Sequence, residues 1–506
     1  MSFVLTVLLS MASPPLAAQA VDDRLVPSGS VRISAWTAFE AWDERFGSGG
    51  ESGRVSLGQA ISAGSAVSLF PGSSMLVDGL RTLTGMGEYE PTMAAVDGRI
   101  SHDITRIDLG LHVGVTDWWT VGVIVPRIKN RSAVDMVFVP DTLGGDLGVS
   151  PYVTAPADVQ AFLSALGAAS TAAGTRADAL CGSGDPQCAS ATSLAERAAM
   201  FDAGMTGVYG ATPFFPLDGS AIGASLGQAV ADLDAELTAA GLAGIEAPLV
   251  LSAERASEAD LATLPSRFDA LGYATPLQTR TGLWSWGDIE IATFARVLDI
   301  DDGSRWSLQV LAGGVARLGT GSAPSADVPL DLGAGDGQTD IEGRMSAYAT
   351  LGGRLSLRMG GLYGVQGSRD ILRREPAPGD VLAPVSTRAV FEWDPGAYHI
   401  LEAEPGIRMA AELTLSATYR YFGKAADTFR ASDGATALPM TASSYRHEVG
   451  GSLTYDTVDR SRDGDARPFR FRLRVLRAVW GGGMSTPAST RVDLGAELFT
   501  TLWGGR

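Results

Sequence analysis

IDLGLHVGVTDWWTVGVIV, residues 107–125, is the stretch of this chain that decides the fold. In its first half, large apolar residues occupy every second position and alternate with Asp, Gly and His. That two-residue period is typical of a β-strand. A turn at Thr116 and Asp117 carries Trp118 and Trp119, after which the alternation resumes. The stretch therefore predicts two antiparallel strands joined by a short turn with flanking tryptophans.

The apolar face of this hairpin would contact either a protein core or lipid. In a soluble sandwich the face would be buried inside the molecule. In an outer membrane it would face hydrocarbon, and the tryptophan pair would lie at the water interface. The rest of the sequence favours the membrane.

Alternating runs recur along the chain and number about twelve, which is an even count, as in bacterial single-chain barrels. They cover residues 31–36, 107–115, 119–125, 287–297, 306–312, 340–349, 355–363, 388–404, 413–421, 448–455, 469–475 and 492–498. We therefore predict an all-β fold, a transmembrane antiparallel up-and-down β-barrel of about 12 strands.

The connections between these runs alternate strictly in length. The long ones are residues 47–97, 140–281, 319–339, 367–384 and 423–441, and the short ones lie near Thr116, Asp299, Gly352, Pro405 and Asp459. Outer-membrane barrels have long extracellular loops and short periplasmic turns. A β-sandwich or β-helix has no reason to alternate in this way, so the loop lengths support the barrel in residues 21–506.

Composition and the N-terminal segment agree with an exported protein. The net charge of −18 argues against a nucleic-acid partner, because phosphate binding needs clustered Lys and Arg. Residues 1–20 resemble a signal peptide that ends in Ala18-Gln19-Ala20, although no basic residue precedes the apolar run and a start further upstream is an alternative. No later run is long and apolar enough for a transmembrane helix.

Cys181 and Cys188 flank the polar, turn-forming segment GSGDPQ. Their close spacing and an oxidising compartment favour a local disulfide. Two free thiols in a loop are the alternative.

From about residue 154 to residue 273 the apolar period changes from two to 3.6, which predicts helices. We interpret residues 140–281 as a helical outer-loop insertion between the third and fourth strands that acts as a cap or plug. A separate domain or a loosely ordered loop are alternatives. Ser257 and Asp260 have the spacing of a capping box, and residues 73–83, SSMLVDGLRTL, predict another short helix.

Residues 469–475 set the inward face of the strands, because Arg470, Arg472 and Arg474 alternate with apolar residues. An arginine that faces hydrocarbon near the midplane costs about 2–4 kcal/mol, so these arginines are predicted to face the lumen. Applied to all strands, this rule gives a predicted set of lumen residues: Asp108, His112, Asp288, Glu290, Arg296, Glu342, Arg344, Arg358, Glu448, Arg470, Arg472, Arg474, Asp493 and Glu497. These side chains either select solutes or form a structural network that holds a narrow barrel in register.

Two groups of tryptophans fit the aromatic belts of a membrane protein. Trp118, Trp119, Trp306 and Trp503 belong to the short-turn end, and Trp284, Trp286, Trp393 and Trp480 belong to the long-loop end.

Enzymatic and metal-binding alternatives find little support. His447 and Glu448 are adjacent on a predicted strand and therefore point to opposite faces, so they do not form an orienting pair. The loop that contains Asp331, Asp336 and Asp340 could in principle bind Ca²⁺ through these carboxylates. An ordinary Asp/Gly turn without a metal explains the same residues and is favoured. We expect no metal and no cofactor.

Four segments resemble an outer-membrane transporter family that is named for the meta-pathway of phenol degradation. They are DLGLHVGVTDWWTVGVIVP (108–126), GLWSWGDIEIATFARVL (282–298), LQVLAGGVARLGTG (308–321) and GLYGVQG (361–367). The resemblance covers the barrel but not the helical insertion. It implies a barrel that moves small, aromatic or hydrophobic molecules across the outer membrane, and it supplies no catalytic motif.

We therefore expect an outer-membrane channel for passive uptake of small solutes, whose partners are outer-membrane lipid and the solute. A structural or partner-binding barrel with a plugged lumen is one alternative, and an outer-membrane lipid-modifying enzyme is another. The sequence leaves the identity of the solute and the oligomeric state open.

Overall fold

The structure is a computed structural model. It describes residues 24–47, 53–303, 305–376, 381–431, 437–438, 443–458, 468–483 and 486–502. The predicted signal peptide, the predicted turn at Asp459 and Trp503 lie outside the described residues.

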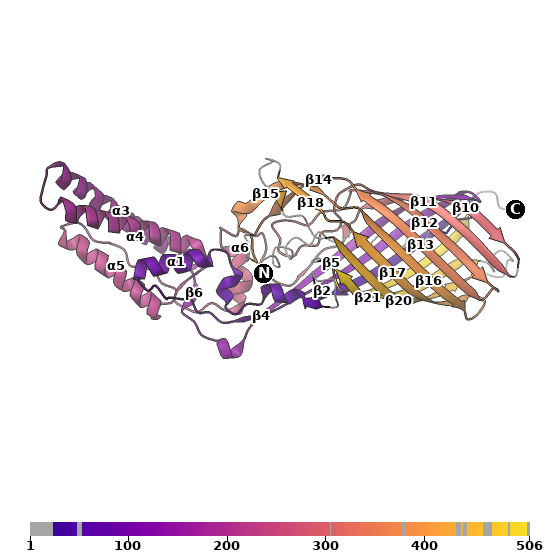
Figure 1. The fold of residues 1–506 in the computed structure, drawn as a ribbon, viewed down its shortest axis with the longest axis horizontal. Helices are drawn as coiled ribbons and strands as arrows, with labels where there is room; N and C mark the ends of the chain where they lie inside the picture. Colours follow the sequence, from indigo (N-terminus) through magenta and orange to yellow (C-terminus); the bar gives the residue numbers. More distant parts are fainter. Residues whose placement is uncertain are drawn as a thin grey trace.

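Twelve long antiparallel strands form a closed barrel (Figure 1). They are β1 (Ser30–Trp42), β4 (Val96–Thr116), β5 (Trp119–Phe138), β10 (Ile289–Asp301), β11 (Trp306–Leu318), β12 (Asp340–Leu351), β13 (Leu355–Gln366), β16 (Tyr398–Arg408), β17 (Leu413–Lys424), β20 (Ser444–Asp456), β21 (Phe469–Gly482) and β22 (Thr490–Thr501). Each strand pairs with the next one along the chain, and β22 pairs with β1. The predicted fold class is confirmed, including an insertion after the third barrel strand.

The outer side of the barrel is apolar and the inner side is charged. Ile291, Ile341 and Leu401 are 51%, 62% and 55% exposed, whereas Arg470 and Arg474 on the opposite face are buried. A closed barrel leaves no strand edge unpaired, which is the condition for a β-structure to cross hydrocarbon. The protein is therefore an outer-membrane β-barrel.

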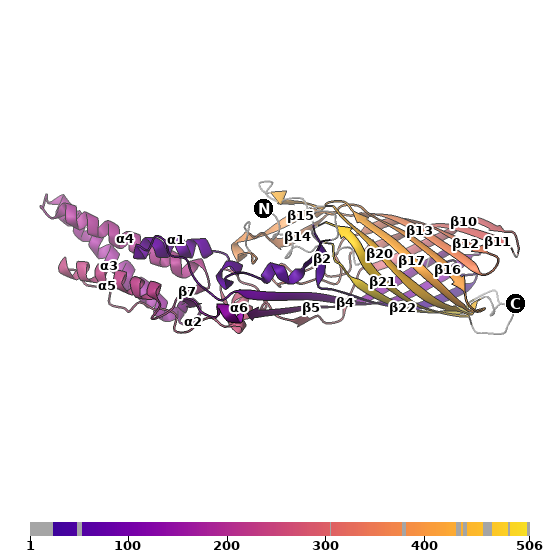
Figure 2. The same ribbon diagram turned by 60° about the horizontal axis from the view of Figure 1, so that its bottom comes forward.

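The short turns and the long connections lie at opposite ends of the barrel (Figures 1 and 2). Two predicted turns are displaced, because β10 continues through Asp299 to Asp301 and β16 continues through Pro405 to Arg408. Pro405 stays in register with Leu357 of β13, whereas the ladder with β17 is interrupted beside it. A proline that lacks an amide hydrogen is tolerated where one side of the ladder is open.

A second, smaller sheet lies at the long-loop end, where the sequence predicts loops except in residues 388–404. It consists of β14 (Arg369–Arg374), β15 (Arg388–Asp394), β18 (Thr428–Ala431) and β19 (Ala437–Leu438). The predicted strand 388–404 is thus two elements, β15 in this small sheet and β16 in the barrel. We call β14, β15, β18 and β19 the mouth sheet.

The helices lie beyond the same end of the barrel and extend away from it (Figures 1 and 2). They are α1 (Ser73–Thr84), α2 (Pro151–Thr154), α3 (Pro156–Gly182), α4 (Cys188–Ala211), α5 (Ala221–Ala239) and α6 (Glu258–Arg267). The first half of β4 and the second half of β5 extend past the other strands to reach them. This position is not that of a plug inside the lumen. No helix among the described residues is long and apolar enough to cross a membrane.

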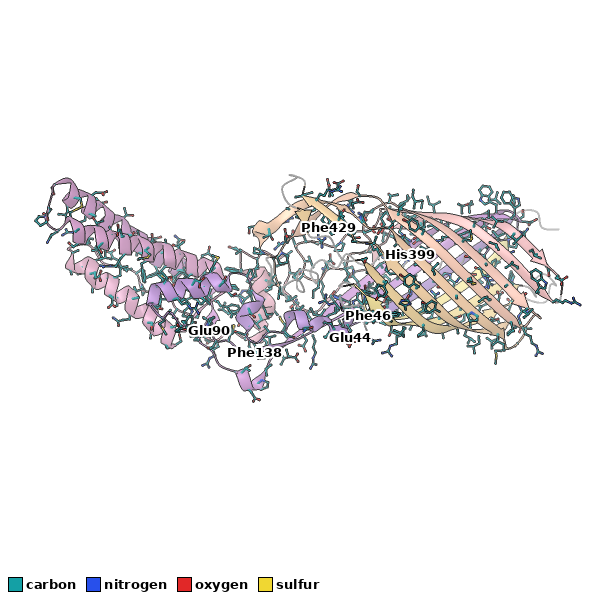
Figure 3. All side chains as sticks on the ribbon, viewed as in Figure 1. Glu44, Phe46, Glu90, Phe138, His399 and Phe429 are labelled. Atoms are coloured by element: carbon teal, nitrogen blue, oxygen red, sulfur yellow. A yellow bond between two sulfur atoms is a disulfide. The ribbon has the colours of Figure 1, made fainter. Side chains whose placement is uncertain are left out.

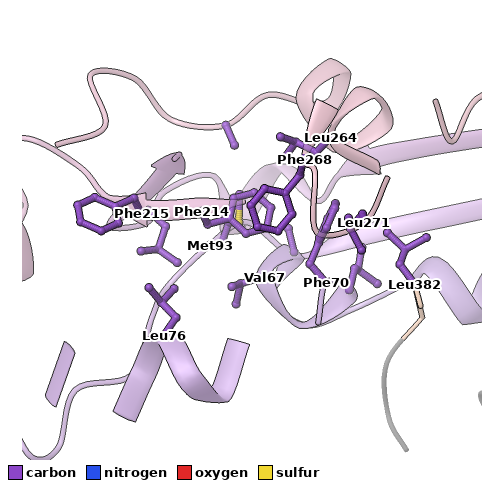
Figure 4. Packing of buried hydrophobic residues seen from close by; sticks show 14 of the residues in the cluster. Val67, Phe70, Leu76, Met93, Phe214, Phe215, Leu264, Phe268, Leu271 and Leu382 are labelled. Atoms are coloured by element: carbon purple, nitrogen blue, oxygen red, sulfur yellow. The ribbon is translucent and has the colours of Figure 1, made fainter. Parts of the chain in front are cut away.

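A hydrophobic core outside the barrel joins the helices to these strand extensions (Figure 4). Phe214 and Phe70 meet edge to face with ring centroids 5.0 Å apart, and Leu76 of α1 and Leu264 of α6 are fully buried. Cys181 and Cys188 form a disulfide between α3 and α4, as predicted. Ser257 caps α6 together with Asp260, which confirms the predicted capping box.

Shorter elements complete the described chain. They are the strands β2 (Glu44–Phe46), β3 (Arg54–Ser56), β6 (Leu147–Val149), β7 (Phe214–Pro216), β8 (Arg280–Thr281) and β9 (Ser285–Trp286), and the 3-10 helices η1 (Leu57–Ile61), η2 (Ala66–Leu69), η3 (Pro140–Thr142) and η4 (Val385–Thr387).

Candidate functional site

The inward faces of the barrel strands carry a network of paired charges, which begins on β4. Arg106 Nε lies 2.7 Å from Asp108 Oδ1, and Arg106 Nη2 lies 2.8 Å from Glu290 Oε1 on β10. All three side chains are buried. The pairing joins β4 to β10 across the intervening strand β5.

Arg317 on β11 is the centre of this first group. Its guanidinium lies 2.8 Å from Glu342 Oε1, 2.9 Å from Asp340 Oδ2 and 3.3 Å from Glu290 Oε1. It also donates to the Tyr398 hydroxyl at 3.1 Å. Glu290, Arg317 and Asp340 are direct neighbours across β10, β11 and β12, so the strand register alone brings these charges together.

A second group lies on β16, β21 and β22. Arg474 Nη2 lies 2.8 Å from Asp493 Oδ2, its directly opposed residue, and Arg474 Nη1 lies 3.2 Å from Glu402 Oε2. Arg472 faces a glycine on β22 and instead reaches Glu404 Oε1 at 2.5 Å.

The second group continues around the barrel. Arg470 Nη1 lies 2.9 Å from Glu497 Oε2. Arg446 Nη2 lies 3.2 Å from Glu448 Oε1, and Arg446 Nη1 lies 3.1 Å from Glu40 Oε1 on β1.

Several of these pairs are fully buried inside the barrel. The side chains of Glu342, Glu448 and Arg446 are 0%, 1% and 2% exposed, so water does not reach them. Buried charges are stable only while they stay paired, and removing one partner is costly. The paired charges therefore form a buried network on the inward faces of the strands.

Most residues of the predicted lumen set belong to this network: Asp108, Glu290, Glu342, Arg344, Arg358, Glu448, Arg470, Arg472, Arg474, Asp493 and Glu497. Their role in solute passage stays a prediction. Three others are placed differently. Arg296 lies toward the short-turn end, immediately before a bulge, and pairs with Asp299 at 2.6 Å. His112 is buried, and its ring occupies the space that a side chain at Gly122 would need.

Asp288 lies at the mouth of the barrel, just before β10. Its carboxylate accepts hydrogen bonds from the backbone amides of Gly321 at 2.7 Å and Asp336 at 3.4 Å. Burial raises the pKa of Asp288 to about 6. These two hydrogen bonds therefore attach the connection between β11 and β12 to the start of β10 at the barrel rim.

Sequence reasoning missed several members of the network: Arg106, Arg317, Glu402, Glu404, Arg446 and Arg491. A usable signal existed for three of them. Arg106 precedes Asp108 by two residues, Arg446 precedes Glu448 by two, and Arg491 precedes Asp493 by two. Extending each predicted strand by one alternation would have placed them on the inward face.

A cavity of about 350 Å³ lies above the network, between the 319–339 connection and the mouth sheet. We call it the mouth cavity. Ile371, Trp393 and Phe429 supply apolar lining, and Phe429 is labelled on the mouth sheet in Figure 3. The charged residues that line the cavity are Arg369, Arg373, Arg374, Arg388, Asp327, Asp331, Asp336 and Asp370.

Arg374 contacts several segments that form the wall of this cavity. Its Nη2 lies 2.7 Å from Asp327 Oδ1 and 2.8 Å from the Gly272 carbonyl, and its guanidinium lies 4.3 Å from the centroid of the Tyr273 ring. Arg388 Nη2 binds the other oxygen of Asp327 at 2.9 Å. These contacts join the mouth sheet, the 319–339 connection and the segment that follows α6.

The floor of the mouth cavity contacts the charge network. Gln366 Nε2 donates to Asp336 Oδ2 at 2.9 Å and to Asp340 Oδ1 at 3.3 Å. Because Asp340 also binds Arg317, a continuous chain of polar contacts links the cavity to the barrel interior.

Trp393 is not a belt residue, so that prediction is wrong. It is 5% exposed and stacks on Phe429 with ring centroids 6.0 Å apart. β15 belongs to the mouth sheet and not to the barrel wall, so its alternation does not report the lipid face. Trp118, Trp119 and Trp480 are exposed, as a belt requires.

The residues considered for the enzymatic and Ca²⁺ alternatives have other partners in the structure. His447 contacts Tyr419 at 2.7 Å, whereas Glu448 is buried on the other face of β20. Asp340 pairs with Arg317, and Asp331 pairs with Arg280 at 3.4 Å. Within the described ranges, no group of three or more His, Cys, Asp or Glu side chains converges as a metal site would require.

No protein-family model and no curated protein sequence matches the chain. Among solved structures, it is similar to an outer membrane channel from Pseudomonas putida F1, with 8% identity, a TM-score of 0.43 and coverage of 95% of this chain and 98% of that chain. It is also similar to the transport unit of the autotransporter AIDA-I from Escherichia coli (5% identity, TM-score 0.33, 99% and 96% coverage) and to the CymD monoaromatic hydrocarbon channel (8%, 0.27, 100% and 95%). These values carry no argument about function, which must come from the residues themselves.

Proposed function

We propose that this protein is an outer-membrane transporter for small solutes with an apolar or aromatic body. The observation that carries the proposal is the mouth cavity, which lies at the long-loop end of the barrel and is lined by Ile371, Trp393 and Phe429. A volume of about 350 Å³ is within the range of small-molecule sites, which typically combine apolar walls with a few polar groups.

Transport in this proposal is gated. Solute enters the mouth cavity from the outside, and the paired charges below it block an open aqueous path. Passage follows when the contacts between Gln366, Asp336 and Asp340 give way. In this proposal the cavity selects the solute, and the charge network closes the path through the barrel.

Filling the cavity tests this proposal. Ala326 lines it, so Ala326→Trp would occupy solute volume without touching the barrel strands. We expect the initial rate of labelled toluene uptake by a porin-deficient Gram-negative host to fall at least threefold relative to the wild-type protein. The matched control is Ala161→Trp on α3, which adds the same side chain at an exposed site far from the cavity.

Two outcomes would contradict the proposal. One is a wild-type rate equal to that of host cells without the protein. The other is an equal loss of uptake in both tryptophan variants when both reach the outer membrane in normal amounts.

The structure also offers an observation for a second candidate function, a barrel that presents a partner-binding surface. The helices α3, α4 and α5 project far from the membrane-embedded part (Figure 2), and a closed lumen is compatible with a non-conducting role. Normal uptake after shortening of this projection would separate the two functions.

A further inference from the structure

Arg373 differs from the other arginines of the mouth cavity. Arg374 and Arg388 both bind Asp327, and Arg369 donates to the Asp336 carbonyl at 3.0 Å. Arg373 has no carboxylate within 4 Å among the described residues, although its side chain is partly buried and lines the cavity. A desolvated guanidinium without an anionic partner is costly for a folded protein.

The nearest candidate partner of Arg373 is already occupied. Asp427 Oδ1 lies 2.8 Å from Lys424 Nζ and accepts the Gly396 amide at 2.9 Å. Burial lowers the pKa of Arg373 to about 10, and the nearby charge of Asp427 offsets only part of this shift. The guanidinium instead lies 4.2 Å from the centroid of the Phe429 ring, a cation–π contact that offsets only part of the desolvation cost.

The side chains around Arg373 indicate which kind of ligand would pair with its guanidinium. On the same face of the mouth sheet, Ile371 lies two residues before it, and Trp393 and Phe429 stack in parallel. The indole Nε1 of Trp393 is buried and has no hydrogen-bond partner among the described residues. The site therefore combines a flat apolar wall, an arginine fork without a counter-ion and an unused N–H donor.

Four arginines and four aspartates line the cavity, so its formal charge is balanced and net charge does not attract an anion. A preference for an anion therefore has to come from the immediate surroundings of Arg373. Asp327 is neutralised by two arginines, and Asp331 pairs with Arg280, whereas Arg373 remains without a partner carboxylate among the described residues. Arginine binds carboxylates with two parallel hydrogen bonds, a geometry that a neutral alcohol cannot match.

We infer that the mouth cavity binds a small carboxylic acid with an aromatic or apolar body, held at its carboxylate by Arg373 and at its body by Trp393 and Phe429. This inference rests on the proposed transport function and names the solute class. Neutral hydrocarbons of the same size would bind through the apolar wall alone, and more weakly.

The test is calorimetric titration of the full mature protein in detergent with benzoate and, as a neutral probe of similar size, benzyl alcohol. We expect Arg373→Gln to weaken benzoate binding at least tenfold and to leave benzyl alcohol binding unchanged. Arg373→Lys keeps the positive charge but lacks the forked guanidinium. Its benzoate affinity should therefore lie between those of the wild type and Arg373→Gln. The matched control Arg430→Gln removes an arginine from the same sheet whose side chain is 66% exposed, and it should bind benzoate like the wild type.

The outcomes separate the two claims. Equal benzoate affinity in the wild type and Arg373→Gln would overturn the assignment of Arg373. Benzyl alcohol binding without benzoate binding would overturn the acid as ligand and leave the proposed transporter standing. If neither probe binds and host cells gain no uptake, the proposed function fails with the inference.

Discussion

At the scale of single residues, alternation along a strand identifies the charges of the interior but not their partners. Arg470, Arg472 and Arg474 had to face inward, and they do. The partners Glu402 and Glu404 lie on a strand whose pattern is weak in the sequence, because Pro405 interrupts it. Which arginine meets which carboxylate depends on register, and a single sequence does not specify register across twelve strands.

Asp288 gives a pH-dependent prediction at this scale. Its folded pKa of about 6 lies above the ordinary value near 4. The folded state therefore holds this proton more tightly, so the carboxyl contributes stability that is fully present below about pH 4 and is lost as the pH rises through 6. From pH 4 to pH 7, we expect the free energy of unfolding to fall by about 2 kcal/mol more in the wild type than in Asp288→Asn.

Denaturant unfolding in detergent at several pH values measures this difference. Asp370→Asn is the control, since Asp370 is an exposed residue at the same cavity and should follow the wild type. Parallel curves for the wild type and Asp288→Asn would contradict the assignment.

At the scale of elements, the long strands were predictable and the short ones were not. A barrel strand such as β12 presents twelve residues of regular alternation, whereas β18 has four and β19 has two. Periodicity needs several repeats to be distinguished from loop sequence, so β14, β18 and β19 were predicted as loops and β15 was merged with β16 into one strand. The candidate site was missed for this reason, because its aromatic wall belongs to that sheet.

For the helices, periodicity predicted that they exist but not where they lie. The 3.6-residue period predicted that helices exist between the third and fourth strands, and they do. It gave no information about where they lie relative to the barrel. Their position follows from the extensions of β4 and β5, which carry the hydrophobic core beyond the rim.

The disulfide should act locally on these helices. It closes a short loop between α3 and α4, with a sequence separation of seven residues. Cys181→Ser with Cys188→Ser is expected to speed hydrogen exchange near the end of this hairpin and to leave the barrel strands unchanged, because the loss of a short-range cross-link costs about 2 kcal/mol where the chain is not otherwise held. Exchange measured by mass spectrometry separates the two regions, and faster exchange in β12 would contradict a local role.

At the scale of the whole molecule, the helices, the mouth sheet and the barrel follow one another along the long axis (Figure 1). The mouth cavity is lined by the mouth sheet, and the charge network lies on the inward faces of the barrel strands. We propose that paired charges in the barrel, and not the helices, close the lumen. This proposal rests on the burial of Arg317, Glu342 and Arg474 within their ion pairs.

Single-channel conductance of the refolded mature protein in a planar bilayer tests this claim most directly. We expect the wild type to insert without a steady conducting level at neutral pH. Replacing Arg472 and Arg474 with alanine should open one, because two guanidinium groups then leave the lumen. Ala161→Trp on the helical projection should stay silent. A steady conducting level in the wild-type protein would contradict the account, since it would mean that water and ions pass the paired charges freely.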